Sequence, residues 1–213
     1  MTDKALLDDL YTWANAIKAD AQTLIGKIDA ARAALPIEPL PRVKFACPLG
    51  GRLKPNGDWP DGLFSATNFN EYYTASGRPA YHPGVDLNHL NLQADWKAPV
   101  YATADGVIVF AGPVYGWQGH VMIQTVLLED GTTLWVRYGH VTPTAKVGDV
   151  VNRGDKIATL ADYAPTANAS GDHLHFDVAR IDLNAQPGDW PGMDTARVLR
   201  DYLDPAKVLS DRA

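Results

Sequence analysis

Near the end of the 213-residue chain stands the sequence Gly171-Asp172-His173-Leu174-His175-Phe176, and Val178 continues its alternation of apolar residues. Apolar residues at every second position predict a β-strand, because successive side chains of a strand point to opposite faces. His173 and His175 would then leave the same face of that strand, about 7 Å apart. This sequence therefore predicts a strand that presents two imidazoles on one face.

A second motif, Tyr81-His82-Pro83-Gly84-Val85-Asp86, lies upstream. His82 and Asp86 are four positions apart, so an extended segment would direct both side chains the same way; a helix would do so too, but Pro83-Gly84 argues against one. Together with His175 the motifs offer two imidazoles and one carboxylate. This donor set leaves a fourth tetrahedral position open, as in catalytic zinc sites. We therefore predict that His82, Asp86 and His175 bind one Zn²⁺ per chain.

Two further histidines are placed to reach the same cavity. His173 shares the strand face of His175, and His140 follows a predicted strand in Arg137-Tyr138-Gly139-His140-Val141. A zinc ion bound in this way lowers the pKa of a bound water towards about 7 and polarises a carbonyl group. His140 and His173 are then candidates to orient the water, to stabilise the tetrahedral oxyanion or to carry a proton to the leaving amine.

The remaining histidines have no assigned role. His89 lies three positions after Asp86 and could compete with it as a ligand, whereas His120 matches no motif. Cys47 is the single cysteine, which excludes an internal disulfide within the chain. It is far from the histidines in sequence, so we predict a small core residue rather than a ligand.

The overall composition is that of an ordinary soluble globular protein, with 46% apolar and 21% charged residues. Its net charge of −6 and the lack of a basic run argue against nucleic acid as a partner. No apolar stretch is long enough to span a bilayer. The start, Met1-Thr2-Asp3-Lys4-Ala5, lacks the features of a signal peptide. We therefore expect a protein made in the cytoplasm, with no membrane span.

Residues 3–35 predict one long helix, because they contain no proline and one glycine, Gly26. Their apolar residues form a heptad-compatible seam: Ala14, Ile17, Ala21, Leu24, Ile28, Ala31 and Leu35. Two interpretations stay open: a coiled coil that forms a homo-oligomer or attaches the protein to a virion or tail, or an amphipathic helix packed on its own domain. We expect a helix over residues 1–35, a proline-rich linker over 36–42 and a domain over 43–213.

The rest of the chain predicts short strands separated by glycine-containing turns. One hairpin is predicted over residues 100–111 around Asp105-Gly106, and a second over residues 121–138 around Glu129-Asp130-Gly131. Residues 146–157 add two further turns around short apolar segments. The expected fold class is mainly β, a small antiparallel barrel or sandwich with an N-terminal helical segment.

The order of these motifs resembles that of the zinc endopeptidases of the lysostaphin type, the M23 family, which cleave peptide cross-links in bacterial peptidoglycan. The resemblance covers roughly residues 43 to 209. It is carried by His82-x-x-x-Asp86, Tyr138-x-His140 and His173-x-His175, and by the flanking sequences Ala98-Pro99-Val100, Asp105-Gly106-Val107, Val147-Gly148-Asp149, Arg153-Gly154-Asp155 and Asp204-Pro205.

The resemblance implies zinc bound by His82, Asp86 and His175, with His140 and His173 as the catalytic pair. It also implies an antiparallel β core with a groove for an extended peptide. The expected function is a zinc metalloendopeptidase that hydrolyses peptide bonds of peptidoglycan, acting on the cell wall as a phage lysin or a virion component. The alternative is a non-catalytic wall-binding or virion structural module that retains the fold.

The sequence departs from the family pattern in three places. Residue 177 is Asp where members often carry Glu, the stretch between Tyr163 and Gly171 lacks the usual glycine-rich lead-in, and His120 stands where a smaller polar residue is expected. None of these departures removes a predicted ligand.

Overall fold

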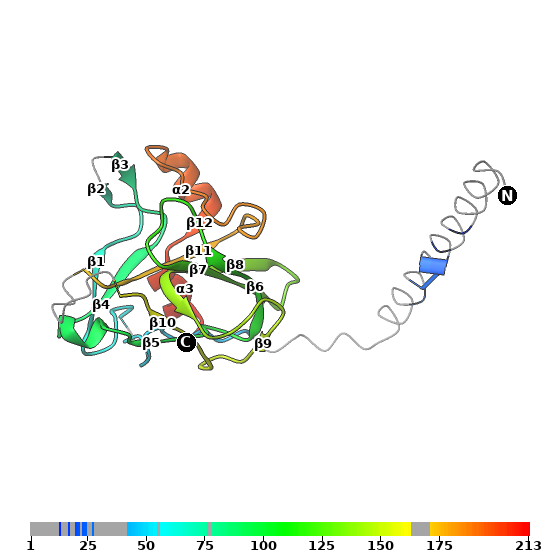
Figure 1. Ribbon diagram of the computed structural model, residues 1–213, viewed down its shortest axis with the longest axis horizontal. Coiled ribbons are helices and arrows are strands. Elements are labelled where there is room, and N and C mark those ends of the chain that lie inside the picture. Colours follow the sequence, from blue (N-terminus) through cyan, green and yellow to red (C-terminus); the bar gives the residue numbers. More distant parts are fainter. Residues whose placement is uncertain are drawn as a thin grey trace. The chain divides into compact units, whose positions relative to one another are not determined.

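The structure is a computed structural model. It describes residues 42–54, 56–75, 78–162 and 171–213, together with the separate positions 13, 17, 20, 21, 23, 24 and 27. The chain divides into two compact units, Met1–Leu40 and Pro41–Ala213. The second unit carries the strands named below and is described by itself (Figure 1).

Only those few positions of the first unit are described. They are helical, and Trp13, Ile17 and Leu24 among them have exposed side chains. Most of the predicted helix over residues 1–35 and of the linker over 36–42 lies outside the described residues. Their bounds, and the choice between a coiled coil and a helix packed on its own domain, therefore stay predictions. Among the described residues, no helix has the length and apolar character needed to cross a membrane.

The second unit is built mainly from antiparallel strands, which confirms the predicted fold class. Its elements are β1 (Leu63–Thr67), β2 (Tyr72–Ala75), β3 (Arg78–Tyr81), β4 (Val85–His89), η1 (Leu92–Asp95), β5 (Pro99–Tyr101), β6 (Gly106–Pro113), β7 (His120–Leu127), β8 (Thr133–Pro143), β9 (Val150–Val151), β10 (Lys156–Leu160), β11 (Leu174–Ala179), α2 (Thr195–Asp201), β12 (Tyr202–Leu203) and α3 (Pro205–Asp211).

One large sheet holds most of these strands in the order β1-β4-β11-β8-β7-β6-β9. The strand β10 pairs with β5 and β8, β12 pairs with β11, and β2 and β3 form a separate hairpin. In Figure 1 the β2–β3 hairpin lies at the same end of this unit as α2. The order places β4 and β8 on either side of β11, so the three predicted histidine and aspartate motifs fall on or beside adjacent strands.

The strand β11 has the two different faces that its alternation predicted. Leu174, Phe176 and Val178 belong to the main hydrophobic core. His175 and Asp177 alternate with them and therefore lie on the opposite face, although both side chains are also buried. The core thus fixes the register of β11, because a shift of one residue would exchange the apolar and the polar face.

The hairpin predicted around Glu129-Asp130-Gly131 is confirmed, since β7 pairs with β8 from His120↔Val141 to Leu127↔Thr133. The hairpin predicted around Asp105-Gly106 is wrong, because β5 pairs with β10 and β6 pairs with β7 and β9. The chain does turn there. However, the Asp105 carboxylate accepts a hydrogen bond from the Arg153 amide at 2.8 Å, and Ala102 bonds with residues 154–155. These distant partners take the place of the local strand pairing.

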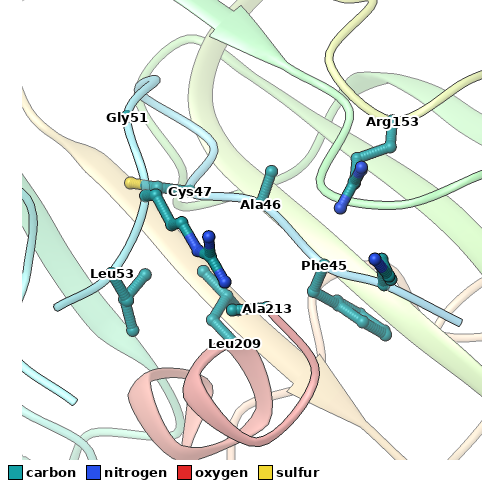
Figure 2. Close-up of a pocket in the computed structure, with 10 residues that line it drawn as sticks. Phe45, Ala46, Cys47, Gly51, Leu53, Arg153, Leu209 and Ala213 are labelled. Atoms are coloured by element: carbon teal, nitrogen blue, oxygen red, sulfur yellow. The ribbon is translucent and has the colours of Figure 1, made fainter. Parts of the chain in front are cut away.

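Figure 2 shows a cavity beside α3, with Leu209 of this helix in its wall. Its volume is about 260 Å³. Phe45, Cys47, Leu53 and Leu209 supply buried parts of its wall. Cys47 is a free thiol with 2% of its surface exposed and belongs to the main core. This confirms that Cys47 is a core residue, and none of the ten residues that line the cavity is a predicted site residue.

Candidate metal centre

The pairing of β11 with its neighbouring strands brings two of the predicted ligands, Asp86 and His175, together. His175 on β11 stands directly opposite Asp86 on β4 and opposite Gly139 on β8. Directly opposed residues have Cβ atoms about 5 Å apart on one face of a sheet. Asp86 and His175 are therefore neighbours because of strand pairing, although they are far apart along the chain.

His82 reaches the same place from the bend between β3 and β4. Its amide donates to the Glu71 carbonyl at 3.0 Å, and its own carbonyl accepts from the Asn70 amide at 2.8 Å. The following turn lies tightly against β11: a Cβ atom on Gly84 would collide with the Phe176 carbonyl oxygen. Glycine at this position lets the bend approach β11 closely, and this holds His82 beside His175.

The three predicted ligands form a compact triangle of donor atoms. His82 Nε2 lies 3.0 Å from His175 Nδ1, and Asp86 Oδ1 lies 3.2 Å from each of these nitrogens. Among the described residues this is the group of His, Cys, Asp and Glu side chains able to hold a metal ion. In a tetrahedral zinc site with bonds of about 2.0–2.1 Å, two donor atoms lie roughly 3.3 Å apart. Both the donor types and their separations therefore fit Zn²⁺.

One side of the triangle faces solvent. The side chains of His82 and His175 are almost fully buried, whereas those of Asp86 and His173 are 16% and 24% exposed. The rings of Trp190 and Tyr73 pack edge-on or tilted against His82, with centroids 5.7 and 5.3 Å away. The buried histidines therefore form the base of the site, and Asp86 and His173 lie on its more exposed side.

His140 is directed into the site by an irregularity in β8. The register between β7 and β8 shifts at this point, from His120↔Val141 to Val121↔Gly139, so His140 is an extra residue in its strand. Its φ of 61° lies in the left-handed region, which is uncommon for a residue other than glycine. Such bulges reorient a side chain and are frequent next to active sites.

His140 and His173 have similar hydrogen-bonding patterns. His140 Nδ1 donates to the Gln118 carbonyl and His173 Nδ1 donates to the Gly171 carbonyl, both at 2.9 Å. A carbonyl only accepts, so each proton is assigned to Nδ1, and Nε2 is the basic nitrogen of each neutral ring. The two ring centroids lie 4.7 Å apart, and His173 Nε2 lies 3.8 Å from Asp86 Oδ1.

The pKa values of the site differ sharply from one another. Burial lowers the pKa of His82, and burial together with nearby His173 lowers the pKa of His140 to about 3, so His140 is neutral at neutral pH. Burial works against the ionisation of Asp86, but its hydrogen bonds with His175 and His82 outweigh burial and hold its pKa well below the ordinary value. Burial likewise disfavours the charged form of His175, yet its bonds to Asp177 and Asp86 raise its pKa.

The predicted site residues are thus brought together, whereas the other two histidines lie elsewhere. His89 Nδ1 bonds to the buried carboxylate of Asp95 at 2.7 Å, and His89 is not in the donor triangle. His120 is half-buried at the start of β7, opposite Val141. The departure noted for the loop before Gly171 falls on residues 163–170, which lie outside the described residues.

The sequence interpretation noted Asp177 only as a departure from the family pattern, and it missed Arg137, Trp117 and Trp190, which also surround the triangle. Asp177 accepts a hydrogen bond from His175 Nε2 at 2.7 Å and pairs with the buried Arg137, while Trp117 and Trp190 pack against the His175 ring. Strand parity could have revealed the first two, because Asp177 follows His175 by two positions and Arg137 precedes Gly139 by two. No local pattern identifies the two tryptophans, which come from loops.

Residues 80–189, more than half of the chain, match Peptidase family M23. The chain therefore belongs to Peptidase family M23, as the resemblance of its motifs indicated. No curated protein sequence matches the chain.

The chain is similar to several solved structures. Lysostaphin from Staphylococcus simulans is 23% identical, with a TM-score of 0.49 over 73% of this chain and 53% of its own. The SpoIIQ–SpoIIIAH pore forming complex is 17% identical, with a TM-score of 0.49 over 78% and 91%. A zinc containing peptidase from Vibrio cholerae is 27% identical, with a TM-score of 0.42 over 57% and 35%. The chain thus spans about half the length of the lysostaphin chain that it matches.

Proposed function

We propose that this M23 family peptidase is a zinc metalloendopeptidase that hydrolyses peptide bonds of bacterial peptidoglycan. The observation that carries the proposal is the triangle formed by His82 Nε2, Asp86 Oδ1 and His175 Nδ1, with sides of 3.0–3.2 Å. These three atoms would hold the zinc ion. When bound there, zinc supplies Lewis acidity, which activates a water molecule and polarises the scissile carbonyl.

His140 and His173 would carry the proton transfers. Each ring donates through Nδ1 to a backbone carbonyl, which fixes the ring and leaves Nε2 as its basic nitrogen. Nε2 of a neutral histidine can take the proton of the attacking water and later deliver it to the leaving amine. The same Nε2–H, once formed, can donate a hydrogen bond to the developing oxyanion.

Hydrolysis of purified peptidoglycan tests this proposal. The protein should lower the turbidity of a wall suspension and release free amino groups. A chelator should stop both effects, and Zn²⁺ added back should restore them. The His173→Ala variant should release far less amine than the wild type; equal release would defeat the assignment.

The alternative, a non-catalytic module that retains the fold, makes the opposite prediction for metal. A purified protein without stoichiometric zinc and without amine release would favour that alternative. Action as a phage lysin or virion component stays part of the proposal, as does assembly through residues 3–35. Comparing the solution mass of the full chain with that of a variant lacking residues 1–35 tests the assembly, and an unchanged monomer in both would remove it.

A further inference from the structure

Arg137 is a fully buried arginine in the middle of β8. It stands opposite Asp177 in the register between β8 and β11. Its Nε and Nη2 atoms lie 2.8 and 2.6 Å from Asp177 Oδ2, and neither side chain is exposed. Removing both charges from water costs free energy that their mutual attraction often does not recover. Stability alone is therefore a weak explanation for a buried ion pair of this kind.

The same carboxylate oxygen also contacts a predicted metal ligand. Asp177 Oδ2 lies 2.7 Å from His175 Nε2. An ionised carboxylate only accepts hydrogen bonds, so His175 carries a proton on Nε2 and donates it to Asp177. The other nitrogen, Nδ1, lies 3.0 Å from His82 Nε2 and 3.2 Å from Asp86 Oδ1, and with the proton on Nε2 it is the nitrogen that can bind a metal there. A partner of this kind fixes the tautomer and the orientation of a ligating histidine.

The guanidinium of Arg137 also reaches the loop that carries Trp190. Its Nη1 donates to the carbonyl oxygens of Pro187 and Asp189 at 3.1 and 2.9 Å. The Trp190 ring next to them lies 5.2 Å from the His175 ring. Arg137 additionally lies 4.9 Å from the ring centroid of Trp117, which packs edge-on against His175 at 5.1 Å. Arg137 thus contacts Asp177, the carboxylate partner of His175. It also bonds to the loop of Trp190 and packs against Trp117, the two tryptophans around the His175 ring.

We propose that Arg137 is a positioning residue for the metal centre: it holds the carboxylate of Asp177 against His175 Nε2, and it holds the Trp190 loop against the ring of His175. This inference rests on the proposed function, since it concerns the ability of His175 to bind zinc. Arg137 itself is not one of the three donor residues.

The test replaces both charges at once, with Arg137→Met and Asp177→Leu in the same chain. Removing one partner alone would leave an uncompensated buried charge and could unfold the protein, whereas apolar replacement of a whole pair is often tolerated. The double variant should keep the circular dichroism and the thermal midpoint of a folded protein. Its zinc dissociation constant, measured by competition with a chromophoric chelator, should rise about 10- to 100-fold.

A matched control removes another arginine–carboxylate pair. Arg212 Nη1 lies 2.8 Å from Glu129 Oε2, and neither residue contacts the donor triangle. The variant Arg212→Met with Glu129→Gln should bind zinc as the wild type does. A folded Arg137→Met/Asp177→Leu variant with wild-type zinc affinity would overturn the inference, because the pair would then be merely structural.

A second measurement applies to the wild type and does not depend on the folding of a variant. In the zinc-loaded protein, ¹⁵N-edited NMR should find the proton of His175 on Nε2 and the metal on Nδ1. A proton on Nδ1 would overturn the inference. A wild type that binds no zinc would overturn the proposed function as well, whereas a zinc-dependent wild type with an unaffected double variant overturns this inference alone.

Discussion

The ring of Trp117 occupies the space that a side chain at position 139 would need: a Cβ atom on Gly139 would collide with Cζ3 of Trp117. Gly139 lies opposite His175 in the sheet, and the Trp117 ring packs edge-on against His175 at 5.1 Å. The glycine of the Tyr138-Gly139-His140 motif is therefore required by the tryptophan that lies over it.

Gly139→Ala should displace Trp117 and disturb the wall of the site. We expect a loss of stability of about 1–3 kcal/mol, typical of inserting an atom into a packed site. We also expect hydrolysis of peptidoglycan to slow by at least ~10-fold, because misplacing groups around a reacting centre is costly. Thermal unfolding and amine release check the two effects. Gly112→Ala on β6 is the control, since its Cβ would meet Phe110 at an ordinary 3.6 Å; equal effects of both substitutions would refute the explanation.

His140→Ala should separate catalysis from metal binding. His140 is outside the donor triangle, so the variant should keep stoichiometric zinc. Loss of a positioned base and hydrogen-bond donor should lower the rate by roughly 100-fold or more. Elemental analysis and amine release on the same sample give both results. Loss of zinc in this variant would show that His140 is a ligand.

The backbone at residue 140 gives a prediction about stability. Its φ of 61° is left-handed, a conformation that costs a residue with a Cβ atom about 1–2 kcal/mol and costs glycine little. His140→Gly should therefore be more stable than His140→Ala by about 1 kcal/mol, although both variants lack the imidazole. Urea unfolding of the two variants checks this, and an alanine variant as stable as the glycine variant would contradict it.

Cys47 should be unreactive in the folded protein. Burial raises the pKa of its thiol to about 12, above the ordinary value near 8.5. At pH 8.5 the folded chain should resist iodoacetamide, and the chain in denaturant should react fully. Because the pKa is raised by folding, the contribution of the neutral thiol to stability is complete below about pH 8.5 and is lost as the pH rises towards 12. Rapid labelling of the folded chain at pH 8.5 would contradict this picture.

Two corners of the donor triangle, Asp86 and His175, could be predicted from strand parity and donor chemistry, which are local properties, whereas His82 lies in the bend between β3 and β4 and not in the extended segment that was expected. His173, His175 and the alternating Leu174 and Phe176 fix one strand and its faces, and their chemistry singles out the few residues able to bind zinc. The pair Arg137–Asp177 follows the same parity rule, since each residue lies two positions from a residue of the site on its own strand.

Other features depend on contacts between distant parts of the chain. The turn at Asp105-Gly106 does not decide which strand pairs with which, since bonds from Ala102 and Asp105 to residues 153–155 replace the local hairpin. Trp117 and Trp190 come from loops, and only the folded chain places them over His175. The left-handed backbone of His140 has no signal in the sequence, because a positive φ usually coincides with glycine and this residue is a histidine.

The most direct test of the central claim is a crystal of the full chain grown with Zn²⁺ and measured at the zinc absorption edge. The anomalous map should show one zinc ion per chain, bound by His82 Nε2, Asp86 Oδ1 and His175 Nδ1, with His140 and His173 outside bonding distance. A map without zinc at this place, or with zinc bound by other side chains, would contradict the account.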